Sequence, residues 1–343
     1  MTSTSLSLRC IGRRADTHDV TSWQFVATEG SLPPVLAGQC VTLHTEIDGQ
    51  PQCRAYTLSS SPQDACWQVT IKDVGRVSHH LHQSLQPGDQ IRADGPFGDF
   101  NLTALPCERP LLLSAGSGIT PMWAMLRDEL AKRPDADIRF IHSARSPEDV
   151  IFADELAALA EAHAGLRHAL VLERVPERVP EEAPVAHPWV GRLTPSMLKE
   201  LAPDLLGRHV YLCGPAPYMA AVSTMLAELG LPAAQLHQES FGLPAVTSGA
   251  APVAAGGDHF WLTLKKSGKK VKILPGQTLL AALEGAGETM MAACRAGVCG
   301  ACRCTTTGEI ERQSVVTLSP QDLESGVALA CSCTARGDVG LDY

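Results

Sequence analysis

Four cysteines lie close together in the stretch AACRAGVCGACRC, residues 292–304. Three of them follow the spacing C-x4-C-x2-C, and a further candidate comes 29 residues later. This spacing is typical of loops that hold a [2Fe–2S] cluster through four thiolates. Small side chains between the cysteines would let backbone N–H groups approach the sulfur atoms of such a cluster. The predicted ligands are Cys294, Cys299, Cys302 and Cys331.

Zinc is the main alternative occupant of these cysteines. Structural zinc sites usually combine two separated C-x2-C pairs, whereas the later part of this chain offers only Cys331-x-Cys333. The spacing therefore favours the iron–sulfur cluster. Cys304 and Cys333 each follow a predicted ligand by two residues, and we expect them to be small buried side chains. Cys333 is the alternative to Cys331 as the fourth ligand.

The composition limits the class of protein further. The 343 residues carry a formal net charge of −9 without a basic run, so no nucleic-acid partner is expected. No stretch approaches the roughly 18 apolar residues of a membrane span, and the first residues lack a signal-peptide pattern. We therefore expect a cytoplasmic protein without a membrane partner. A reducing compartment also disfavours disulfides between the cysteines.

A second group of chemically useful side chains occurs in RAYTLSS, residues 54–60, at the end of a predicted strand. Arg54 offers a cation, Tyr56 an aromatic ring and Thr57 a hydroxyl group. A flavin nucleotide needs a positive charge beside its phosphates, a ring to stack on the isoalloxazine and a hydrogen bond near N5. The pattern therefore indicates flavin binding, with a plain core position for Tyr56 as the alternative.

The segment DVGRVSHHL, residues 73–81, strengthens this prediction. Gly75 can turn the chain, and Val77 and Ser78 can begin a short helix whose N-terminus faces a pyrophosphate. Three histidines lie on the same predicted helix: His79, His80 and His82. Because no matching ligand cluster lies nearby in the sequence, we expect these histidines to form a solvated face rather than a metal site.

Two glycine-containing turns, SAGSGITPM at 114–122 and YLCGPAPYM at 211–219, each join a predicted strand to a predicted helix. Glycines allow the backbone to approach a phosphate, and a helix N-terminus favours an anion. Turns at the carboxyl ends of parallel strands frame one crevice, where open α/β sheets bind dinucleotides. The residues of these turns that we predict to bind the nucleotide are Gly116, Gly118, Gly214 and Pro215.

Ser143 and Arg145 lie at the end of the next predicted strand. Either could contact the adenosine ribose of NADH or the 2′-phosphate of NADPH. A plain surface position for Arg145 is equally consistent with the sequence. The residue types therefore leave the choice between NADH and NADPH open.

The predicted secondary structure around these residues changes in type along the chain. Residues 1–105 contain short strand-like runs between turns, which predicts an antiparallel barrel. Residues 106–241 alternate strand-like with helix-like segments, including a predicted helix over 148–163, which indicates βα units around a parallel sheet. Residues 242–257 are rich in Ala, Gly, Pro and Ser and are expected to form a linker. Residues 258–343 form a small domain that carries the clustered cysteines.

Together and in this order, the motifs resemble those of the ferredoxin-NADP reductase superfamily with an added C-terminal plant-type ferredoxin domain. The resemblance covers nearly the whole chain. The segments that carry it are RAYTLSS, the Gly75–Ser78 loop, GPFGDF, GSGITP, CGPAPYM and CRAGVCGAC. It implies a multidomain fold with an antiparallel β-barrel flavin domain, an α/β nicotinamide domain with a parallel sheet, and an α+β ferredoxin domain of the β-grasp type.

The resemblance also implies an oxidoreductase that passes electrons from NADH through FAD and the [2Fe–2S] cluster to a protein acceptor. Arg54, Val77 and Ser78 would contact the FAD pyrophosphate. Tyr56 would stack on the flavin, and Thr57 would form a hydrogen bond near N5. The residues implied near the nicotinamide or the other flavin face are Thr120, Cys213, Glu239 and Phe241.

Two choices stay open within the resemblance. Arg76 stands where the pyrophosphate loop of the family often has a second glycine, so FMN stays an alternative to FAD. The segments SPEDVIFADEL and GRLTPSMLKEL are most similar to NADH oxidoreductases that serve the hybrid-cluster protein. This similarity implies that acceptor and a role in nitric oxide or hydroxylamine detoxification. The oxygenase component of a Rieske-type oxygenase or demethylase is the alternative acceptor, because its reductases combine the same three modules.

Overall fold

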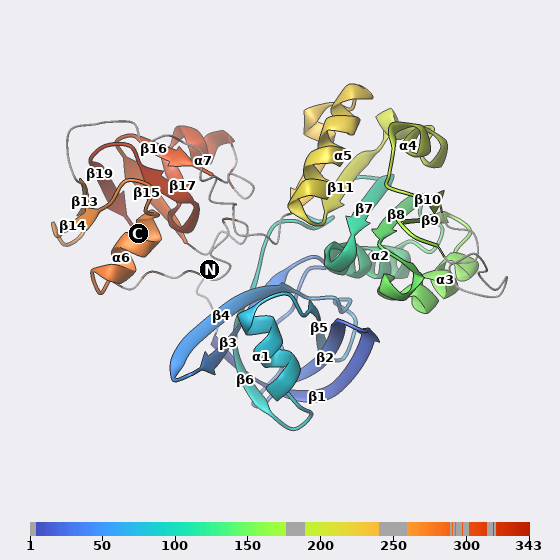
Figure 1. The fold of residues 1–343 in the computed structure, drawn as a ribbon, viewed down its shortest axis with the longest axis horizontal. Helices are drawn as coiled ribbons and strands as arrows, with labels where there is room; N and C mark the ends of the chain where they lie inside the picture. Colours follow the sequence, from blue (N-terminus) through green and yellow to red (C-terminus); the bar gives the residue numbers. More distant parts are fainter. Residues whose placement is uncertain are drawn as a thin grey trace. The chain divides into compact units, whose positions relative to one another are not determined.

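The structure is a computed structural model, in which the chain forms an N-terminal and a C-terminal compact unit (Figure 1). The predicted linker at 242–257 lies outside the described residues. Among the residues that are described, no helix combines the length and the apolar character needed to cross a membrane. The residues that the structure describes are 5–175, 189–239, 259–288, 290, 292, 297, 302–313, 318 and 320–343.

Six strands of the N-terminal unit form an antiparallel sheet in the order β4-β3-β6-β1-β2-β5. Leu58, directly after β4, forms an antiparallel bridge with Val69 of β5, so the two edges of the sheet meet and close a barrel. The predicted antiparallel β-barrel is therefore confirmed. The strands are β1 (Ser5–Thr17), β2 (Val20–Ala27), β3 (Cys40–Ile47), β4 (Gln50–Thr57), β5 (Trp67–Lys72) and β6 (Gln90–Phe97).

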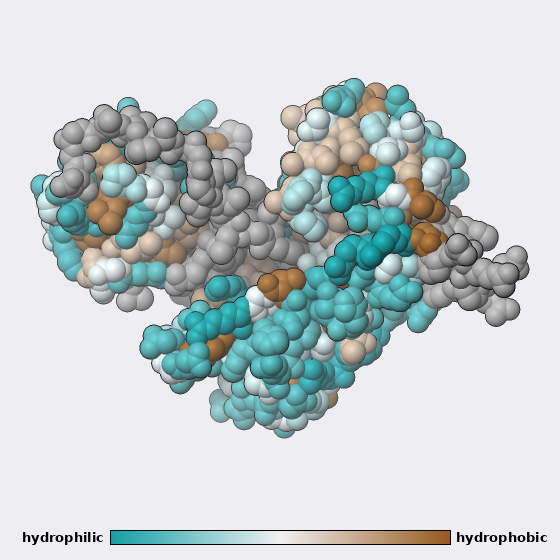
Figure 2. Space-filling model, viewed as in Figure 1, coloured by the Kyte–Doolittle hydropathy of each residue, from teal (hydrophilic) through white to brown (hydrophobic). Residues whose placement is uncertain are grey.

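The interior of the barrel is apolar because successive side chains of a strand point to opposite faces. Trp23 and Phe25, two residues apart on β2, are both almost completely buried in this interior. Helix α1 (Arg76–Ser84) packs onto the barrel through Val77 and Leu81, which belong to the same apolar cluster. The surface that Figure 2 shows around α1 is mainly hydrophilic, as expected when the apolar side chains point inward.

The prediction of a solvated histidine face on α1 is wrong for His82. His79 is exposed, as expected. His82 packs its ring edge against Trp23, with 5.0 Å between ring centroids, and its Nε2 lies 2.9 Å from the carbonyl oxygen of Ile71. His82 comes four residues after the buried Ser78, so it lies on the helix face that is turned to the barrel.

Six further strands of the same unit form a parallel sheet in the order β10-β9-β8-β7-β11-β12. This sheet confirms the predicted α/β fold of the nicotinamide domain. Its strands are β7 (Pro110–Ala115), β8 (Ile138–Ala144), β9 (Leu166–Leu172), β10 (Trp189–Val190), β11 (His209–Cys213) and β12 (Leu236–Glu239). Its helices are α2 (Ile119–Lys132), α3 (Ala153–Ala162), α4 (Pro195–Leu201) and α5 (Ala216–Glu228).

Helices cover both faces of the parallel sheet (Figure 1). Leu112 of β7 packs on the side of α2 and α3, whereas its neighbours Leu111 and Leu113 pack on the side of α4 and α5. All three side chains are completely buried. A strand that is buried on both faces has a continuous apolar run, which explains why the sequence around Leu111–Leu113 predicts a buried strand.

Helix α3 is shorter than the sequence predicts. The predicted helix covers 148–163, but α3 begins at Ala153, after a separate 3₁₀ turn at Pro147–Asp149. Phe152 between them has a left-handed backbone with φ of 60°, and its buried ring stacks on Trp123 with 4.9 Å between centroids. The packing of this ring against α2 outweighs the local helix propensity.

The C-terminal unit contains a mixed sheet in the order β14-β13-β19-β15-β17, in which β13 and β19 are parallel. Helix α6 (Leu279–Gly285) packs into the same apolar core as this sheet. A separate short ribbon pairs β16 with β18. This arrangement confirms the predicted α+β fold of the β-grasp type. The other elements are β13 (Phe260–Leu264), β14 (Lys270–Ile273), β15 (Arg303–Thr307), β16 (Ile310–Arg312), α7 (Pro320–Glu324), β17 (Val327–Leu329), β18 (Cys333–Ala335) and β19 (Val339–Asp342).

Candidate nucleotide, flavin and cluster sites

A cavity of about 520 Å³ opens at the carboxyl ends of the parallel strands. Open α/β sheets bind their ligands at this edge, and the volume lies in the range of small-molecule sites. Barrel residues such as Lys72 complete the wall, so both domains of the N-terminal unit contribute to the cavity. The predicted nucleotide-binding residues that line it are Gly116, Ser143, Arg145 and Pro215.

The two predicted glycine turns meet beside this cavity. A Cβ atom at Gly118 would overlap the backbone of Cys213, and one at Gly214 would lie 2.8 Å from Tyr218 Cδ1. Only glycine fits at either position without a shift of its neighbours. This close approach brings the N-termini of α2 and α5 to the same edge of the sheet, as a dinucleotide site requires.

Two buried hydroxyl groups at the cavity lie beside each other, and neither makes a hydrogen bond of ordinary geometry to the described residues. They are Ser143 Oγ, at the end of β8, and Tyr218 OH, in the first turn of α5. Burial raises the pKa of Tyr218 well above its ordinary value, so this hydroxyl stays protonated. Since buried polar groups are nearly always paired, these two hydroxyls are suited to form hydrogen bonds with a bound nucleotide.

The carboxyl ends of β11 and β12 place a thiol beside a carboxylate. Cys213 is paired in register with Glu239, and both side chains are almost completely buried. Burial, together with the charge of Glu239, raises the pKa of the Cys213 thiol, so the thiol stays protonated at neutral pH. Thr120, in the first turn of α2, donates its hydroxyl to the carbonyl oxygen of Ser117 at 3.1 Å. Phe241, which was also expected here, lies outside the described residues.

The three flavin residues expected in RAYTLSS lie at the end of β4. Arg54 and Tyr56 are two residues apart, so their side chains leave the same face of the strand. The Arg54 guanidinium is exposed and donates to the carbonyl oxygen of Cys53 at 2.7 Å. Tyr56 is half-buried against the barrel core, and Thr57 is buried. A cation, a ring and a hydroxyl therefore occur together, which is the set of groups that fits a flavin nucleotide.

The first turn of α1 contains Val77 and Ser78, the two residues that the resemblance implies beside the FAD pyrophosphate. Ser78 Oγ accepts from the backbone N–H groups of Val74 and Gly75 at 3.0 and 2.9 Å. Val77 is buried in the barrel core. These two side chains therefore shape the turn, and the backbone N–H groups of the first helical turn, which begins at Arg76, are suited to a phosphate.

Two of the four predicted cluster ligands are among the described residues. Cys302 and Cys331 are both buried, and the backbone nitrogen of Cys331 lies 3.5 Å from Cys302 Sγ. The backbone nitrogen of Gly297 lies 3.2 Å from Cys331 Sγ. Backbone N–H groups directed at neighbouring buried sulfur atoms fit the surroundings of cluster thiolates. Cys294 and Cys299 lie outside the described residues.

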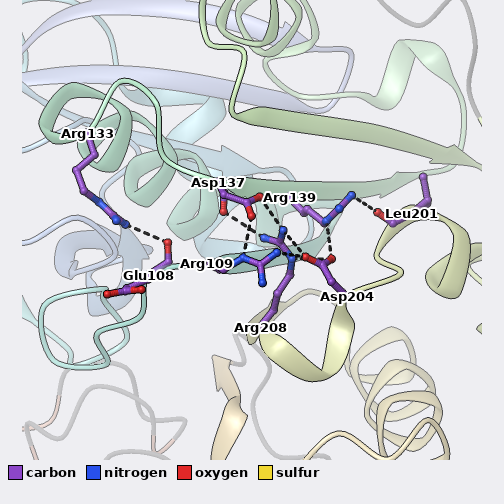
Figure 3. Close-up of polar contacts among 8 residues, drawn as sticks. All are labelled: Glu108, Arg109, Arg133, Asp137, Arg139, Leu201, Asp204 and Arg208. Atoms are coloured by element: carbon purple, nitrogen blue, oxygen red, sulfur yellow. Dashed lines mark hydrogen bonds and ion pairs between the residues drawn. The ribbon is translucent and has the colours of Figure 1, made fainter.

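The amino-terminal edge of the parallel sheet, opposite the cavity, carries a network of ion pairs (Figure 3). The side chain of Arg208 is completely buried, and its Nη2 lies 2.6 Å from Asp137 Oδ1 and 2.8 Å from Asp204 Oδ2. Arg109 contacts both carboxylates, and Arg139 contacts Asp204. Hydrogen bonds from Arg208 lower the pKa of Asp204 to about 2. The charges of the network are paired with one another, which indicates a structural role.

Comparison with known proteins gives a domain type for each of three parts of the chain. Family models match for the oxidoreductase FAD-binding domain at 14–102, the oxidoreductase NAD-binding domain at 112–224 and the 2Fe-2S iron–sulfur cluster binding domain at 262–336. The glycine betaine monooxygenase reductase subunit of Pseudomonas aeruginosa is 35% identical over 98% of this chain and 94% of its own length. The chain belongs to the ferredoxin-NADP reductase superfamily. The predicted oxidoreductase, with its FAD, NAD and [2Fe–2S] domains, is thereby confirmed.

Two further relatives of this reductase carry different names. The stachydrine N-demethylase reductase subunit of Rhizobium meliloti is 32% identical over 94% of this chain and 92% of its own length. The NADH oxidoreductase HCR of Escherichia coli is 34% identical over 90% of this chain and 89% of its own length. Similarity to both kinds of reductase supports a protein acceptor without deciding which one.

Reasoning from the sequence missed several residues that line the cavity of the reductase, among them Lys72, Glu173 and Tyr218. Tyr218 lies within YLCGPAPYM, and its place in the first turn of a helix at this edge was an available signal. Glu173 follows β9, a third strand end at the edge where ligands bind. Lys72 comes from the barrel, and no sequence pattern connects it with the nicotinamide domain.

Proposed function

We propose that this reductase oxidises NADH and delivers single electrons to the oxygenase component of a Rieske-type monooxygenase that demethylates a betaine. The observation that carries this proposal is full-length similarity. Reductases named for glycine betaine monooxygenase and for stachydrine N-demethylase match 98% and 94% of this chain. Glycine betaine and stachydrine are both amino acids with a fully alkylated, permanently charged nitrogen. The oxygenase would bind that substrate, and the reductase would recognise the oxygenase.

The hybrid-cluster protein is the second candidate acceptor. It is supported by the NADH oxidoreductase HCR, whose similarity extends over 90% of this chain at 34% identity. The segments SPEDVIFADEL and GRLTPSMLKEL also favour this acceptor. We place the oxygenase ahead of it because the reductases named for oxygenases match more of the chain at comparable identity.

In this function each predicted domain would bind one cofactor. Residues 1–105 would bind FAD, and residues 106–241 would bind NADH. The linker at 242–257 would join them to the cluster domain at 258–343. When bound, FAD would supply the conversion between the two-electron chemistry of NADH and the one-electron chemistry of the cluster.

The residues of this chain would bind and orient the reactants. Arg54 and the backbone N–H groups at the start of α1 would bind the FAD pyrophosphate, and Tyr56 would stack on the flavin. Ser143 and Tyr218 would donate hydrogen bonds to NADH in the cavity. The buried, protonated Cys213 thiol would keep water away from the nicotinamide, since it brings neither charge nor a strong hydrogen-bonding group.

The proposal is tested by reconstitution with each acceptor in turn. The flavin- and cluster-loaded reductase is mixed with NADH, O2, glycine betaine and a purified oxygenase component that demethylates it. Loss of one methyl group as formaldehyde consumes one NADH, one proton and one O2 and releases one water. Coupled transfer therefore predicts equal amounts of formaldehyde formed and NADH oxidised.

A parallel reaction replaces the oxygenase and glycine betaine with the hybrid-cluster protein and hydroxylamine. Faster NADH oxidation with the oxygenase than with the hybrid-cluster protein is the expected result. Faster oxidation with the hybrid-cluster protein, or NADH oxidation without formaldehyde, would reject the oxygenase as the acceptor and favour the second candidate.

A further inference from the structure

The sequence leaves open whether Arg145 receives the 2′-phosphate of NADPH. Arg145 follows β8, lines the nucleotide cavity and is half-exposed. Its Nη2 lies 3.0 Å from Asp149 Oδ1 and 3.4 Å from Asp19 Oδ2. Asp149 belongs to the nicotinamide domain, whereas Asp19 lies between β1 and β2 of the barrel. One guanidinium is therefore held by carboxylates from two domains.

Both carboxylates are fixed by further contacts. The side chain of Asp149 is only 10% exposed, and its Oδ2 accepts from Ser146 Oγ at 3.0 Å. Asp19 Oδ2 lies 3.0 Å from Lys72 Nζ, and Lys72 also lines the cavity. Burial alone would raise the pKa of Asp19, but the hydrogen bond and charge of Lys72 outweigh burial and bring this pKa below its ordinary value. Asp19 is therefore ionised at neutral pH.

The third cation of the cavity, Arg192, is largely exposed and has one carboxylate partner. Arg192 Nε lies 2.8 Å from Glu173 Oε1, and both residues line the cavity. A 2′-phosphate carries nearly two negative charges at neutral pH and is best bound by an arginine fork that is not already engaged. Among the described residues, each cation that lines the cavity has a carboxylate partner. The pairs are Lys72–Asp19, Arg145–Asp149 and Arg192–Glu173.

We propose that Asp19 and Asp149 make this reductase selective for NADH by holding Arg145 away from a 2′-phosphate. To bind the phosphate, Arg145 would have to leave two carboxylates, which would then repel the phosphate at short range. The ribose of NADH carries hydroxyl groups instead, and a hydroxyl can donate to a carboxylate without adding charge. This inference rests on the proposed oxidation of a nicotinamide nucleotide and is independent of the acceptor.

A metal ion is a poorer occupant of the same carboxylates. His18, Asp19 and Asp149 bring possible ligand atoms within 4.8 Å of one another. The two carboxylates already contact Lys72 and Arg145. A divalent cation would have to bind beside both positive charges, which repel it. The two carboxylates therefore bind Arg145 rather than a metal ion.

The first measurement compares the two nucleotides on the flavin-loaded protein. Ferricyanide serves as the electron acceptor because it needs no partner protein, and kcat/KM is measured for NADH and for NADPH. The expected preference for NADH is more than about tenfold. A wild-type protein that uses NADPH as well as NADH would overturn the inference and would leave the proposed acceptor untouched.

Substitutions then test which side chains set the preference. Asp19→Asn and Asp149→Asn are each expected to raise kcat/KM for NADPH relative to NADH by about fivefold or more. This gain should vanish when Arg145→Gln is added to either substitution. Asp64→Asn is the matched control, because Asp64 pairs with Arg127 across the same two domains but does not line the nucleotide cavity.

A binding measurement separates selectivity from turnover. The flavin-loaded proteins are titrated in a calorimeter with adenosine 2′,5′-bisphosphate and with 5′-AMP, which differ only in the 2′-phosphate. Asp19→Asn and Asp149→Asn should tighten binding of the bisphosphate by about fivefold, and neither should tighten binding of 5′-AMP. Equal tightening of both ligands, or a gain no larger than that of Asp64→Asn, would overturn the inference.

Discussion

At the scale of single residues, the cysteines of the C-terminal unit differ in what their sulfur atoms contact. Cys331 Sγ accepts from the backbone N–H of Gly297, which lies in the predicted cluster loop, at 3.2 Å. Cys304 Sγ donates to the carbonyl oxygen of Ala328, its partner across β15 and β17, at 3.4 Å. The thiol of Cys304 is therefore engaged within the sheet, as expected for a residue that is not a ligand. Cys331 stays the predicted fourth ligand.

Replacing Cys331 by serine removes one soft sulfur ligand from the predicted cluster. We expect NADH-driven reduction of ferricyanide to continue, because ferricyanide can take electrons from the flavin. Reduction of cytochrome c should fall by more than about tenfold, together with the visible absorbance of the cluster. Cys304→Ser is the matched control and should preserve both signals. Unchanged cytochrome c reduction in Cys331→Ser would favour Cys333 as the fourth ligand.

At the scale of elements, the two edges of the parallel sheet have different roles. The carboxyl ends of β7, β8 and β11 present small residues and backbone to the nucleotide cavity. The amino ends of the same strands are joined by the network around Arg208 (Figure 3). Because the side chain of Arg208 is completely buried, its charge is stable only while Asp137 and Asp204 are ionised. The network therefore holds together the amino ends of the strands whose carboxyl ends line the nucleotide cavity.

Removal of one carboxylate from this network should weaken the fold and leave the chemistry unchanged. Asp204 accepts hydrogen bonds from Arg208 and Arg139, so Asp204→Asn is expected to lower the free energy of unfolding by about 3 kcal/mol. The control is Asp48→Asn, which breaks an exposed pair with Arg76 and should change this energy by less than about 0.5 kcal/mol.

Urea denaturation measures both of these effects, and kcat/KM for NADH should be similar in the two variants. Equal losses of stability in Asp204→Asn and Asp48→Asn would contradict a structural role for the network.

At the scale of the whole molecule, ion pairs join the barrel to the nicotinamide domain within the N-terminal unit. Arg127 donates two hydrogen bonds to Asp64 at 2.7 and 2.8 Å. Arg14 of the barrel pairs with Glu155 of α3 at 2.5 Å. Contacts of this kind join the two domains of the N-terminal unit, both of which line the nucleotide cavity.

The stability of this unit should fall as the pH drops below about 6.5, because of His142. The ring is completely buried in the parallel sheet, with Nδ1 2.9 Å from Ser114 Oγ. Burial lowers the pKa of His142 to about 3. Between about pH 6.5 and about pH 3 the unfolded chain binds a proton at this histidine, whereas the folded protein excludes it. Each pH unit therefore removes about 1.4 kcal/mol of stability, and no loss is expected above the unfolded pKa.

Urea denaturation of the wild type and of His142→Gln, between about pH 7.5 and about pH 5, tests this prediction. The variant lacks the excluded proton but keeps every other titrating group. Below about pH 6 the wild type should lose about 1.4 kcal/mol per pH unit more than the variant. Parallel pH dependences in the two proteins would show that His142 does not contribute.

Most elements and all three cofactor domains follow from patterns that lie within short segments. The sequence predicts a strand at 109–116 and a helix at 120–133, and the structure has them at Pro110–Ala115 and Ile119–Lys132. An apolar run that ends at a glycine, and a period of 3.6 residues, are both complete within one segment. The C-x4-C-x2-C spacing also lies within one short segment. Together with the other motifs, it indicates the superfamily without any knowledge of the tertiary structure.

Fold class and chemistry therefore follow from patterns along the chain, whereas the contacts of the side chains around the cavity depend on how distant segments pack. Asp19 and Arg145 are 126 positions apart, and nothing near either residue predicts their pairing. Phe152 interrupts a predicted helix because its ring stacks on a residue of another helix. Periodicity and spacing depend only on neighbours along the chain, whereas ion pairs, ring contacts and buried hydroxyls depend on which distant segments the fold brings together.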